Sequence, residues 1–373
     1  MSAVKAQGGG GWSSSPGGDR VPVAVLGATG AVGQTFIRLL DGHPLFRVAE
    51  VAASERSAGK TYAEAMTWHE GQLPADVAGL TVSACDPSEV KSKIVFSAMD
   101  ASVAGEVEQA FARAGAIVLS NAKNHRMDAD VPLVIPELNA DHLSLIDVQR
   151  ANRGWTGAII TNANCASTVI AVALGPLHSA FGARRAVVVT LQAVSGAGYP
   201  GVASLDILGS VIPYIGGEEE KIEREVNKLL GSLGTGGVTP APITLSAHAN
   251  RVAVEHGHTA CITVGFERRV TPEEALEVLE GWRGHEICRG LPSAPAEPLV
   301  VCKEPDRPQA RKDVHTGRGM TTLVGRVRAD PLMHLRLVAL SHNTVRGAAG
   351  GSILNAEVLG RMGRLPGVAE GAW

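Results

Sequence analysis

Short apolar runs separated by polar turns follow one another through the first half of the chain. They have the length and the β-branched content of buried strands, and they cover residues 21–26, 46–53, 80–82, 93–98 and 116–120. Helical spacing of apolar residues lies between them, most clearly over residues 102–114. Strands that alternate with helices predict a mostly parallel, doubly wound sheet.

The second half contains further strand-like stretches, which predict a sizeable mixed sheet from residues 186–194, 245–254, 259–266, 299–301, 321–328 and 335–340. Two helices are expected here. One is strongly charged and begins within residues 216–225, and the other, over residues 271–282, opens with Thr-Pro-Glu-Glu. Residues 131–139 are expected to be extended. A last helix over residues 346–359 is rich in Gly and Ala, and we expect it to pack closely against the first domain.

Composition narrows the class of protein. A chain of 373 residues with 45% hydrophobic and 19% charged residues is typical of a globular protein with two domains. The formal net charge of -3 gives no reason to expect nucleic acid or an anionic membrane as a partner, and no apolar run reaches the roughly 18 residues that span a bilayer. The five cysteines form no C-x-x-C pair, which argues against a disulfide framework and a structural zinc site. We therefore expect a reducing compartment, the cytoplasm.

A glycine-rich turn, Gly27-Ala28-Thr29-Gly30-Ala31-Val32-Gly33, lies between the first expected strand and a helix over residues 34–40. Glycines at such a turn let the backbone approach a pyrophosphate, which the helix N-terminus then faces. The second strand ends in Ser54-Glu55-Arg56-Ser57, where an NAD site would place an acid for the ribose hydroxyl. Small hydroxyls and an Arg suit a 2′-phosphate instead, so NADP is favoured. A solvated turn is the alternative interpretation.

Cys165 stands where an apolar strand over residues 158–160 meets an apolar helix over residues 169–174. At a helix N-terminus, unpaired N–H groups and the helix dipole lower the pKa of a thiol. Asn162 and Asn164 beside it are small polar residues that cap a helix or hold an anion. One interpretation is an activated nucleophile, and the other is a buried cysteine that only fills space.

Other polar residues stand at the ends of expected strands or in loops. Gln192 ends one strand, a Gly-His turn with His258 follows another, and Arg126 lies in the polar loop 121–130. The amide of Gln192 is a hydrogen-bond donor, the imidazole of His258 is a general base, and the guanidinium of Arg126 is a cation that binds an anion. His248, His256 and His258 also invite a metal site, but their scattered spacing, without a nearby Cys, disfavours it.

Taken together, the motifs resemble those of aspartate-β-semialdehyde dehydrogenase, over nearly the whole chain from about residue 21 to residue 363. The matching segments are G-A-T-G-A-V-G, the N-x-N-C centre, L-Q-A-V-S-G-A-G, P-Y-I-G-G-E-E-E-K, R-V-x-V-x-x-G-H and N-T-V-R-G-A-A-G. The P-Y-I-G-G-E-E-E-K form is similar to the archaeal and fungal branch of the family.

The resemblance implies NADPH-dependent reduction of L-aspartyl-4-phosphate to aspartate semialdehyde with release of phosphate. It implies that Cys165 is the nucleophile that forms an acyl-thioester. His258 is then the acid/base partner, and Gln192 orients the acyl-enzyme. An acyl phosphate needs a strong nucleophile, which a thiolate paired with a His supplies.

The resemblance also implies which residues bind the substrate and the cofactor. Arg251 is expected to hold the substrate carboxylate and Glu218 the ammonium, although Glu219 and Glu220 are adjacent alternatives. The residues implied for the phosphate are Arg126, Asn164 and Lys221. Those implied for NADP are Gly27, Thr29, Gly30, Ala31, Val32, Gly33, Ser54, Arg56, Ser57, Ser195, Gly196 and Asn343.

The implied fold is α/β, with an N-terminal Rossmann-type, doubly wound NADP-binding domain and an α+β catalytic and dimerisation domain with a mixed sheet. We expect a disordered tail at residues 1–20, the first domain at 21–164 joined by the C-terminal helix 345–365, and the second domain at 165–344. The family pattern is a homodimer or homotetramer. An acyl-CoA reductase, such as malonyl-CoA reductase, and a non-catalytic NADP-binding sensor are the rival interpretations.

Overall fold

The computed structural model describes residues 20–368, so the predicted tail lies outside the described residues except for Arg20. The N-terminal half forms a seven-stranded sheet with the order β3-β2-β1-β4-β5-β7-β6, in which every pair is parallel. Its strands are β1 Val21–Leu26, β2 Phe46–Ala53, β3 Val82–Ala84, β4 Ile94–Ser97, β5 Ile117–Ser120, β6 Leu133–Val134 and β7 Ala158–Asn162. This is the doubly wound parallel sheet that the alternating pattern predicts.

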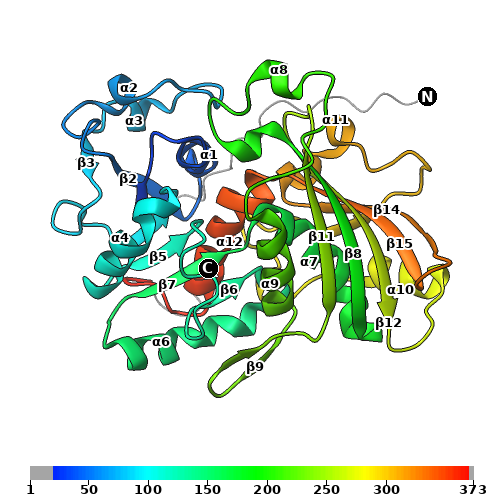
Figure 1. Ribbon diagram of the computed structural model, residues 1–373. Coiled ribbons are helices and arrows are strands. Elements are labelled where there is room, and N and C mark those ends of the chain that lie inside the picture. The colour runs from blue at the N-terminus through cyan, green and yellow to red at the C-terminus, as the bar shows by residue number, and fades with distance from the viewer. Residues whose placement is uncertain (1–19, 369–373) are drawn as a thin grey trace.

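Helices separate these strands along the chain (Figure 1). They are α1 Ala31–Leu40, α2 Tyr62–Ala65, α3 Ala75–Ala78, α4 Ala101–Arg113, α5 Pro136–Asn139, the short 3-10 helix η1 Ala140–Ser144 and α6 Leu145–Arg153. The expectation of an extended segment over residues 131–139 is wrong in its second half. Pro136 begins a helical turn there, and the Asn139 side chain accepts the backbone N–H of Ile135 at 2.9 Å and so stabilises that turn.

A second, six-stranded sheet has the order β11-β8-β12-β15-β14-β13. Its strands are β8 Ala183–Gln192, β11 Thr244–Arg251, β12 His258–Phe266, β13 Leu299–Val301, β14 Thr322–Ala329 and β15 Leu335–Ser341. The β8–β11 and β13–β14 pairs are parallel and the others antiparallel, so the sheet is mixed as predicted. Figure 1 shows the two sheets side by side.

One face of the mixed sheet is covered and the other is open. The helices α7 Cys165–Phe181, α9 Glu218–Leu229 and α10 Pro272–Gly281 contribute to one apolar core with the inward residues of the sheet. Along β8 and β11, buried residues alternate with more exposed ones, which places the second set on the uncovered face. Shorter elements join these parts: η2 Val194–Ala197, α8 Ser204–Ile207, β9 Ser232–Gly234, β10 Gly237–Thr239, η3 Glu286–Cys288, α11 Ala310–Asp313 and η4 Thr316–Gly319.

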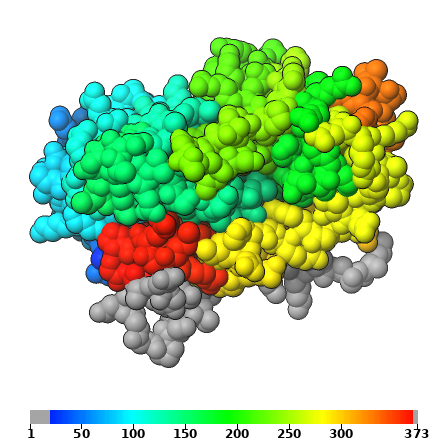
Figure 2. All heavy atoms as spheres, turned by 90° about the horizontal axis from the view of Figure 1, so that it is seen from below, coloured from blue at the N-terminus to red at the C-terminus, as the bar shows by residue number. Residues whose placement is uncertain are grey.

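The chain returns to the first domain at its end. A π-helical turn, η5 Val345–Ala349, leads into α12 Gly350–Arg361, so the α-helix begins later than residue 346. Ile353, Leu354 and Val358 pack in the same core as Val25 of β1, which agrees with the expected close packing. Figure 2 shows the face on which the end of α12 lies beside η3, where Arg361 donates to a carbonyl oxygen at 2.9 Å. The domain division at residue 164 stays a prediction.

Candidate active site

Cys165 is the first residue of α7, directly after β7 of the parallel sheet. Asn164 is the N-cap, and its side-chain oxygen accepts the backbone N–H groups of Ala166 at 2.8 Å and Ser167 at 3.1 Å. Gly347 lies against the cysteine, because a Cβ at that position would stand 2.7 Å from the Cys165 Cβ. The nucleophile candidate is therefore held between a capped helix start and the turn that follows β15.

His258, the first residue of β12, faces this cysteine. The Cys165 Sγ and His258 Nε2 are 3.1 Å apart, and the imidazole is fully buried. The backbone N–H of Ala193 donates to His258 Nδ1 at 3.1 Å, so the neutral ring carries its proton on Nε2. This tautomer presents an N–H to the sulfur.

The helix start acts on the pKa of Cys165 in the expected, lowering direction, but burial outweighs it. Burial raises the pKa of the thiol to about 12, and the negative charge of Glu218 adds to that rise. The charges of Arg126 and Arg251 and the N–H of Ala166 act in the lowering direction but do not outweigh burial. Burial also lowers the pKa of His258 to about 3. The resting pair is thus a neutral thiol beside a neutral imidazole.

Gln192 and Arg251 end two neighbouring parallel strands, β8 and β11, and are partners in the register. Both are buried, and Arg251 Nη1 donates to the carbonyl oxygen of Ala193 at 2.8 Å. Gly196 lies close to this guanidinium and to His258, since a Cβ there would stand 2.9 Å from Arg251 Nη1 and 3.0 Å from His258 Cε1. A side chain at residue 196 would therefore enter the site.

The acidic run opens α9, and its three acids have different surroundings. Glu218 is buried, accepts from Asn164 Nδ2 at 2.9 Å and pairs with Lys221 Nζ at 2.9 Å. Burial alone would raise the pKa of Glu218, but the charge of Lys221 and the two hydrogen bonds hold it below its usual value. Glu219 accepts the backbone N–H of Ala249 at 2.9 Å, and Glu220 is exposed. Only Glu218 of the three contacts a residue of the site.

Arg126 reaches the same region from the loop that follows β5. It is buried, its Nη1 donates to Glu225 Oε1 at 2.9 Å, and its Nη2 donates to the carbonyl oxygen of Asn121 at 2.6 Å. Its Nε is buried without a hydrogen-bond partner among the described residues, so a donor remains for an anion. The second oxygen of Glu225 accepts the backbone N–H of Asn164 at 2.7 Å.

Sequence reasoning missed Glu225, which joins two of the predicted phosphate-binding residues. The signal was present in the sequence. Residues 218, 221, 222 and 225 follow the helical spacing of one face, and Glu225 is seven positions after Glu218. Glu218 and Glu225 of this face both accept hydrogen bonds from Asn164 at the start of α7.

The glycine turn after β1 has the geometry expected of a phosphate-binding loop. Gly27 has φ of 69°, and a Cβ there would stand 2.6 Å from the Ala98 carbonyl oxygen. A Cβ at Gly33 would stand 2.3 Å from the Gly27 carbonyl oxygen. Gly30 is the N-cap of α1, and no side chain in the described part of the chain caps that helix, which leaves N–H groups of its first turn for an anion. Thr29, Ala31 and Val32 complete the turn.

A cavity of about 370 Å³ joins this turn to the second domain, because Ala31 and Ser195 both line it. The Ser195 hydroxyl accepts from Asn343 Nδ2 at 2.8 Å, and Asn343 Oδ1 accepts the backbone N–H of Gly257 at 2.8 Å. Asn343 thus holds the residue next to His258, and Ser195 in turn holds Asn343. Ser54, Arg56 and Ser57 form a turn after β2, with Ser54 and Arg56 exposed, and none of them contacts the cysteine region.

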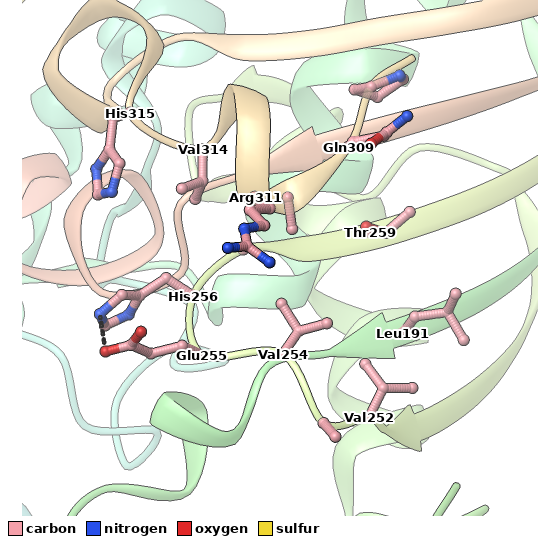
Figure 3. Close-up of a pocket in the computed structure, with 14 residues that line it drawn as sticks. Leu191, Val252, Val254, Glu255, His256, Thr259, Gln309, Arg311, Val314 and His315 are labelled. Carbon is pink, nitrogen blue, oxygen red and sulfur yellow. Dashed lines mark ion pairs between the residues drawn. The ribbon is translucent and has the colours of Figure 1, made fainter. Parts of the chain in front are cut away.

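A further cavity of about 790 Å³ lies beside the segment 252–257 that leads into His258 (Figure 3). Leu191 and Thr259 of the mixed sheet line it together with Arg311 and His315, whereas Cys165 does not. It is therefore separate from the contact between Cys165 and His258 and is continuous with the uncovered sheet face. Within residues 20–368, no set of three His, Cys, Asp or Glu side chains is arranged to hold a metal ion. No helix in the same range is both long and apolar enough to cross a membrane.

Comparison with known proteins agrees with this architecture. The family model for the NAD binding domain of semialdehyde dehydrogenase matches residues 22–146, and the model for its dimerisation domain matches residues 174–346. An aspartate-semialdehyde dehydrogenase of Archaeoglobus fulgidus is 48% identical over 341 residues, which are 91% of this chain and 98% of the relative. The enzyme of Schizosaccharomyces pombe is 47% identical over 350 residues, with the same shares covered.

Solved structures of aspartate semialdehyde dehydrogenases have the same fold as this chain. The Candida albicans aspartate semialdehyde dehydrogenase with NADP superposes with a TM-score of 0.84 at 40% identity, covering 91% of this chain and 98% of that one. Aspartate semialdehyde dehydrogenase II from Vibrio cholerae, complexed with ASA, has a TM-score of 0.72 at 27% identity, covering 92% and 99%.

Proposed function

Because the chain belongs to the aspartate-semialdehyde dehydrogenase family, we propose that it converts L-aspartyl-4-phosphate to L-aspartate 4-semialdehyde, with NADPH as the reductant and phosphate as the second product. This oxidoreductase reaction lies on the pathway from aspartate to threonine, methionine and isoleucine, and in some organisms to lysine. The observation that carries the proposal is the 3.1 Å contact between Cys165 Sγ and His258 Nε2 at a capped helix start.

In the first half of the reaction, Cys165 Sγ attacks the acyl carbon and the bond between that carbon and the phosphate oxygen breaks. A thioester forms, and the thiol proton leaves with the phosphate, so charge and atoms balance. His258 Nε2–H donates to the sulfur and stabilises the thiolate as it develops. This role fits a ring whose Nδ1 already accepts the N–H of Ala193.

Two groups of residues orient the substrate. The guanidinium of Arg251 binds the carboxylate through paired hydrogen bonds, and the carboxylate of Glu218 binds the ammonium. Gln192 orients the carbonyl of the acyl-enzyme. The burial of all three supports these roles, because charged and polar interactions are stronger where water is excluded.

The departing phosphate needs compensating positive charge and N–H donors. Lys221 and Arg126, whose Nε has no hydrogen-bond partner within residues 20–368, supply the charge, and Asn164 adds its amide. Asn164 also caps α7 and donates to Glu218, so it links the phosphate site to the nucleophile.

NADPH supplies, when bound, the hydride that reduces the thioester carbonyl. The glycine turn fits its pyrophosphate, because close packing excludes side chains there and no side chain caps α1. We place the 2′-phosphate at the turn after β2 and the nicotinamide end near Ser195, Gly196 and Asn343. The residues proposed to hold the cofactor are Gly27, Thr29, Gly30, Ala31, Val32, Gly33, Ser54, Arg56, Ser57, Ser195, Gly196 and Asn343.

The test is a spectrophotometric assay of NADPH formation from aspartate semialdehyde, phosphate and NADP, with NAD in a parallel reaction. Phosphate-dependent NADPH formation is the expected result, and Cys165→Ala abolishes it while NADPH binding is retained. A folded, reduced enzyme without this activity contradicts the proposal and makes malonyl-CoA the next substrate to try. Equal rates with NAD and NADP would contradict the proposal that Arg56 and its neighbours bind the 2′-phosphate of NADP.

The dimerisation domain implies an oligomer. We propose a cytoplasmic homodimer, or a tetramer built from it, and five cysteines that form no disulfide support that compartment. The uncovered sheet face and an exposed apolar segment over residues 199–214 support association through the second domain. In that segment Leu205 is 91% exposed and Tyr199 69% exposed.

We place the division between the two domains after residue 164, as the sequence predicts.

A further inference from the structure

Lys228, near the end of α9, is a buried cation with all of its donors in use. Its Nζ donates to the carbonyl oxygens of Arg126 at 2.8 Å, Asp128 at 2.7 Å and Val131 at 2.9 Å. Only 4% of the residue is exposed. An ammonium group has three N–H donors, so these three carbonyls account for each of them.

The three carbonyls belong to the loop after β5 that carries Arg126. The backbone of Arg126 is therefore held by Lys228, while its guanidinium is held by Glu225, one turn earlier on the same helix face. Glu225 also accepts the backbone N–H of Asn164. The second half of α9 thus contacts both the loop and the helix cap that border the proposed phosphate site.

We propose that Glu225 and Lys228 are positioning residues for the phosphate site, which set the place of Arg126 and Asn164 relative to Cys165. The inference rests on the proposed function, because it concerns the phosphate that this reaction releases. Neither residue touches the reacting atoms. They act through the guanidinium and the amide that they hold.

The pH dependence of phosphate binding distinguishes a positioning role of Lys228 from a role in packing alone, because the number of N–H donors on Lys228 depends on its ionisation. Burial lowers the pKa of Lys228 to about 8, against the opposing charges of Asp128, Asp130 and Glu225. His142 also faces it, and the Lys228 charge is one of the causes that lower the pKa of that imidazole. A neutral amine has two N–H donors, so one carbonyl of the loop loses its partner above this pKa. Phosphate binding is therefore expected to weaken as the pH rises through about 8.

The experiment measures the KM for phosphate over the neutral and alkaline range in the semialdehyde oxidation assay. It compares the wild type with Lys228→Met and Lys228→Arg, and with Lys303→Met as a control for the loss of an exposed lysine. We expect Lys228→Met to raise the KM for phosphate by about tenfold or more at neutral pH, because the loop carbonyls lose their donor. Lys228→Arg stays charged, so its KM is expected to lose the alkaline rise. Lys303→Met is expected to behave as the wild type.

Direct phosphate binding keeps the test independent of turnover. Phosphate at its site is expected to protect Cys165 from iodoacetamide, and the concentration for half protection gives its affinity. Glu225→Gln is the second variant if Lys228→Met does not fold, and it is expected to weaken protection by about tenfold or more. An inactive wild type that phosphate still protects contradicts the proposed function alone.

Two results would overturn the inference. One is a phosphate affinity that is unchanged in folded Lys228→Met and Glu225→Gln. The other is a loss of kcat in proportion to the folded fraction, with an unaltered KM for phosphate and an unaltered pH profile, which shows that both residues only support the fold.

Discussion

Replacement of Gly347 by alanine tests how rigidly the turn after β15 positions the nucleophile. A Cβ at residue 347 would stand 2.7 Å from the Cβ and 2.8 Å from the Cα of Cys165. Carbon atoms in contact are about 3.5–4.0 Å apart, so the added methyl group overlaps by roughly 0.8 Å. Both atoms of Cys165 are fixed by the helix start, and a rotamer change at this residue does not relieve the contact. The start of α7 or the turn itself has to move.

A displacement of about 1 Å at a reacting group costs on the order of 100-fold in rate, and overpacking of a buried contact costs about 1–3 kcal/mol of stability. We therefore expect Gly347→Ala to lower kcat/KM for aspartate semialdehyde on the order of 100-fold. Steady-state kinetics and thermal unfolding measure the two effects. Gly281→Ala is the matched control, because beyond its chain neighbours and its own helix backbone no atom of residues 20–368 lies within 4 Å of the added Cβ. Wild-type kcat/KM and unfolding temperature in Gly347→Ala would refute the reasoning.

Three further predictions concern the site and the assembly. Arg251→Leu is expected to raise the KM for aspartate semialdehyde about 10- to 100-fold, since a carboxylate loses its charged partner, and an unchanged KM removes Arg251 from the site. Because burial raises the pKa of Cys165 to about 12 and lowers that of His258 to about 3, alkylation of Cys165 by iodoacetamide in the free enzyme is expected to accelerate with pH through the alkaline range. Peptide mapping identifies Cys165 as the alkylated residue. An alkylation rate that already levels off near neutral pH would show a preformed ion pair of thiolate and imidazolium instead. Leu205→Asp is expected to raise the monomer fraction in analytical ultracentrifugation without unfolding the chain, because Leu205 is 91% exposed, and an unchanged oligomer excludes this segment from the interface.

Local pattern was sufficient for most elements of the fold. Apolar runs predicted the strands of both sheets, and Thr-Pro-Glu-Glu predicted the start of α10, where Thr271 and Glu274 form a capping box. The errors lie at element ends and over residues 136–139, which form a helical turn where extended chain was expected. The stretch 245–254 was expected to continue as strand, but β11 ends at Arg251. The residues that follow are apolar, yet the N–H of Val254 donates to the Val252 carbonyl, which closes a tight turn and directs the chain toward His258.

The family and its chemistry were also accessible from the sequence, because they depend on short motifs whose residues are close together along the chain. The archaeal and fungal character predicted from P-Y-I-G-G-E-E-E-K agrees with the relatives from Archaeoglobus fulgidus and Schizosaccharomyces pombe. The roles of individual site residues stay predictions.

The sequence by itself determined most of the elements and the helix-start cysteine, since both are encoded by local spacing, and it indicated the kind of reaction through the resemblance of its motifs to a known family. Only the tertiary structure decided the ionisation of Cys165, because burial is a sum over neighbours from many segments and it outweighs the helix start. The same holds for Gly347 and for Lys228, whose partners lie far away in sequence and meet them only when the two domains and α9 pack together. Local spacing does not encode such contacts, because the packing of distant segments creates them.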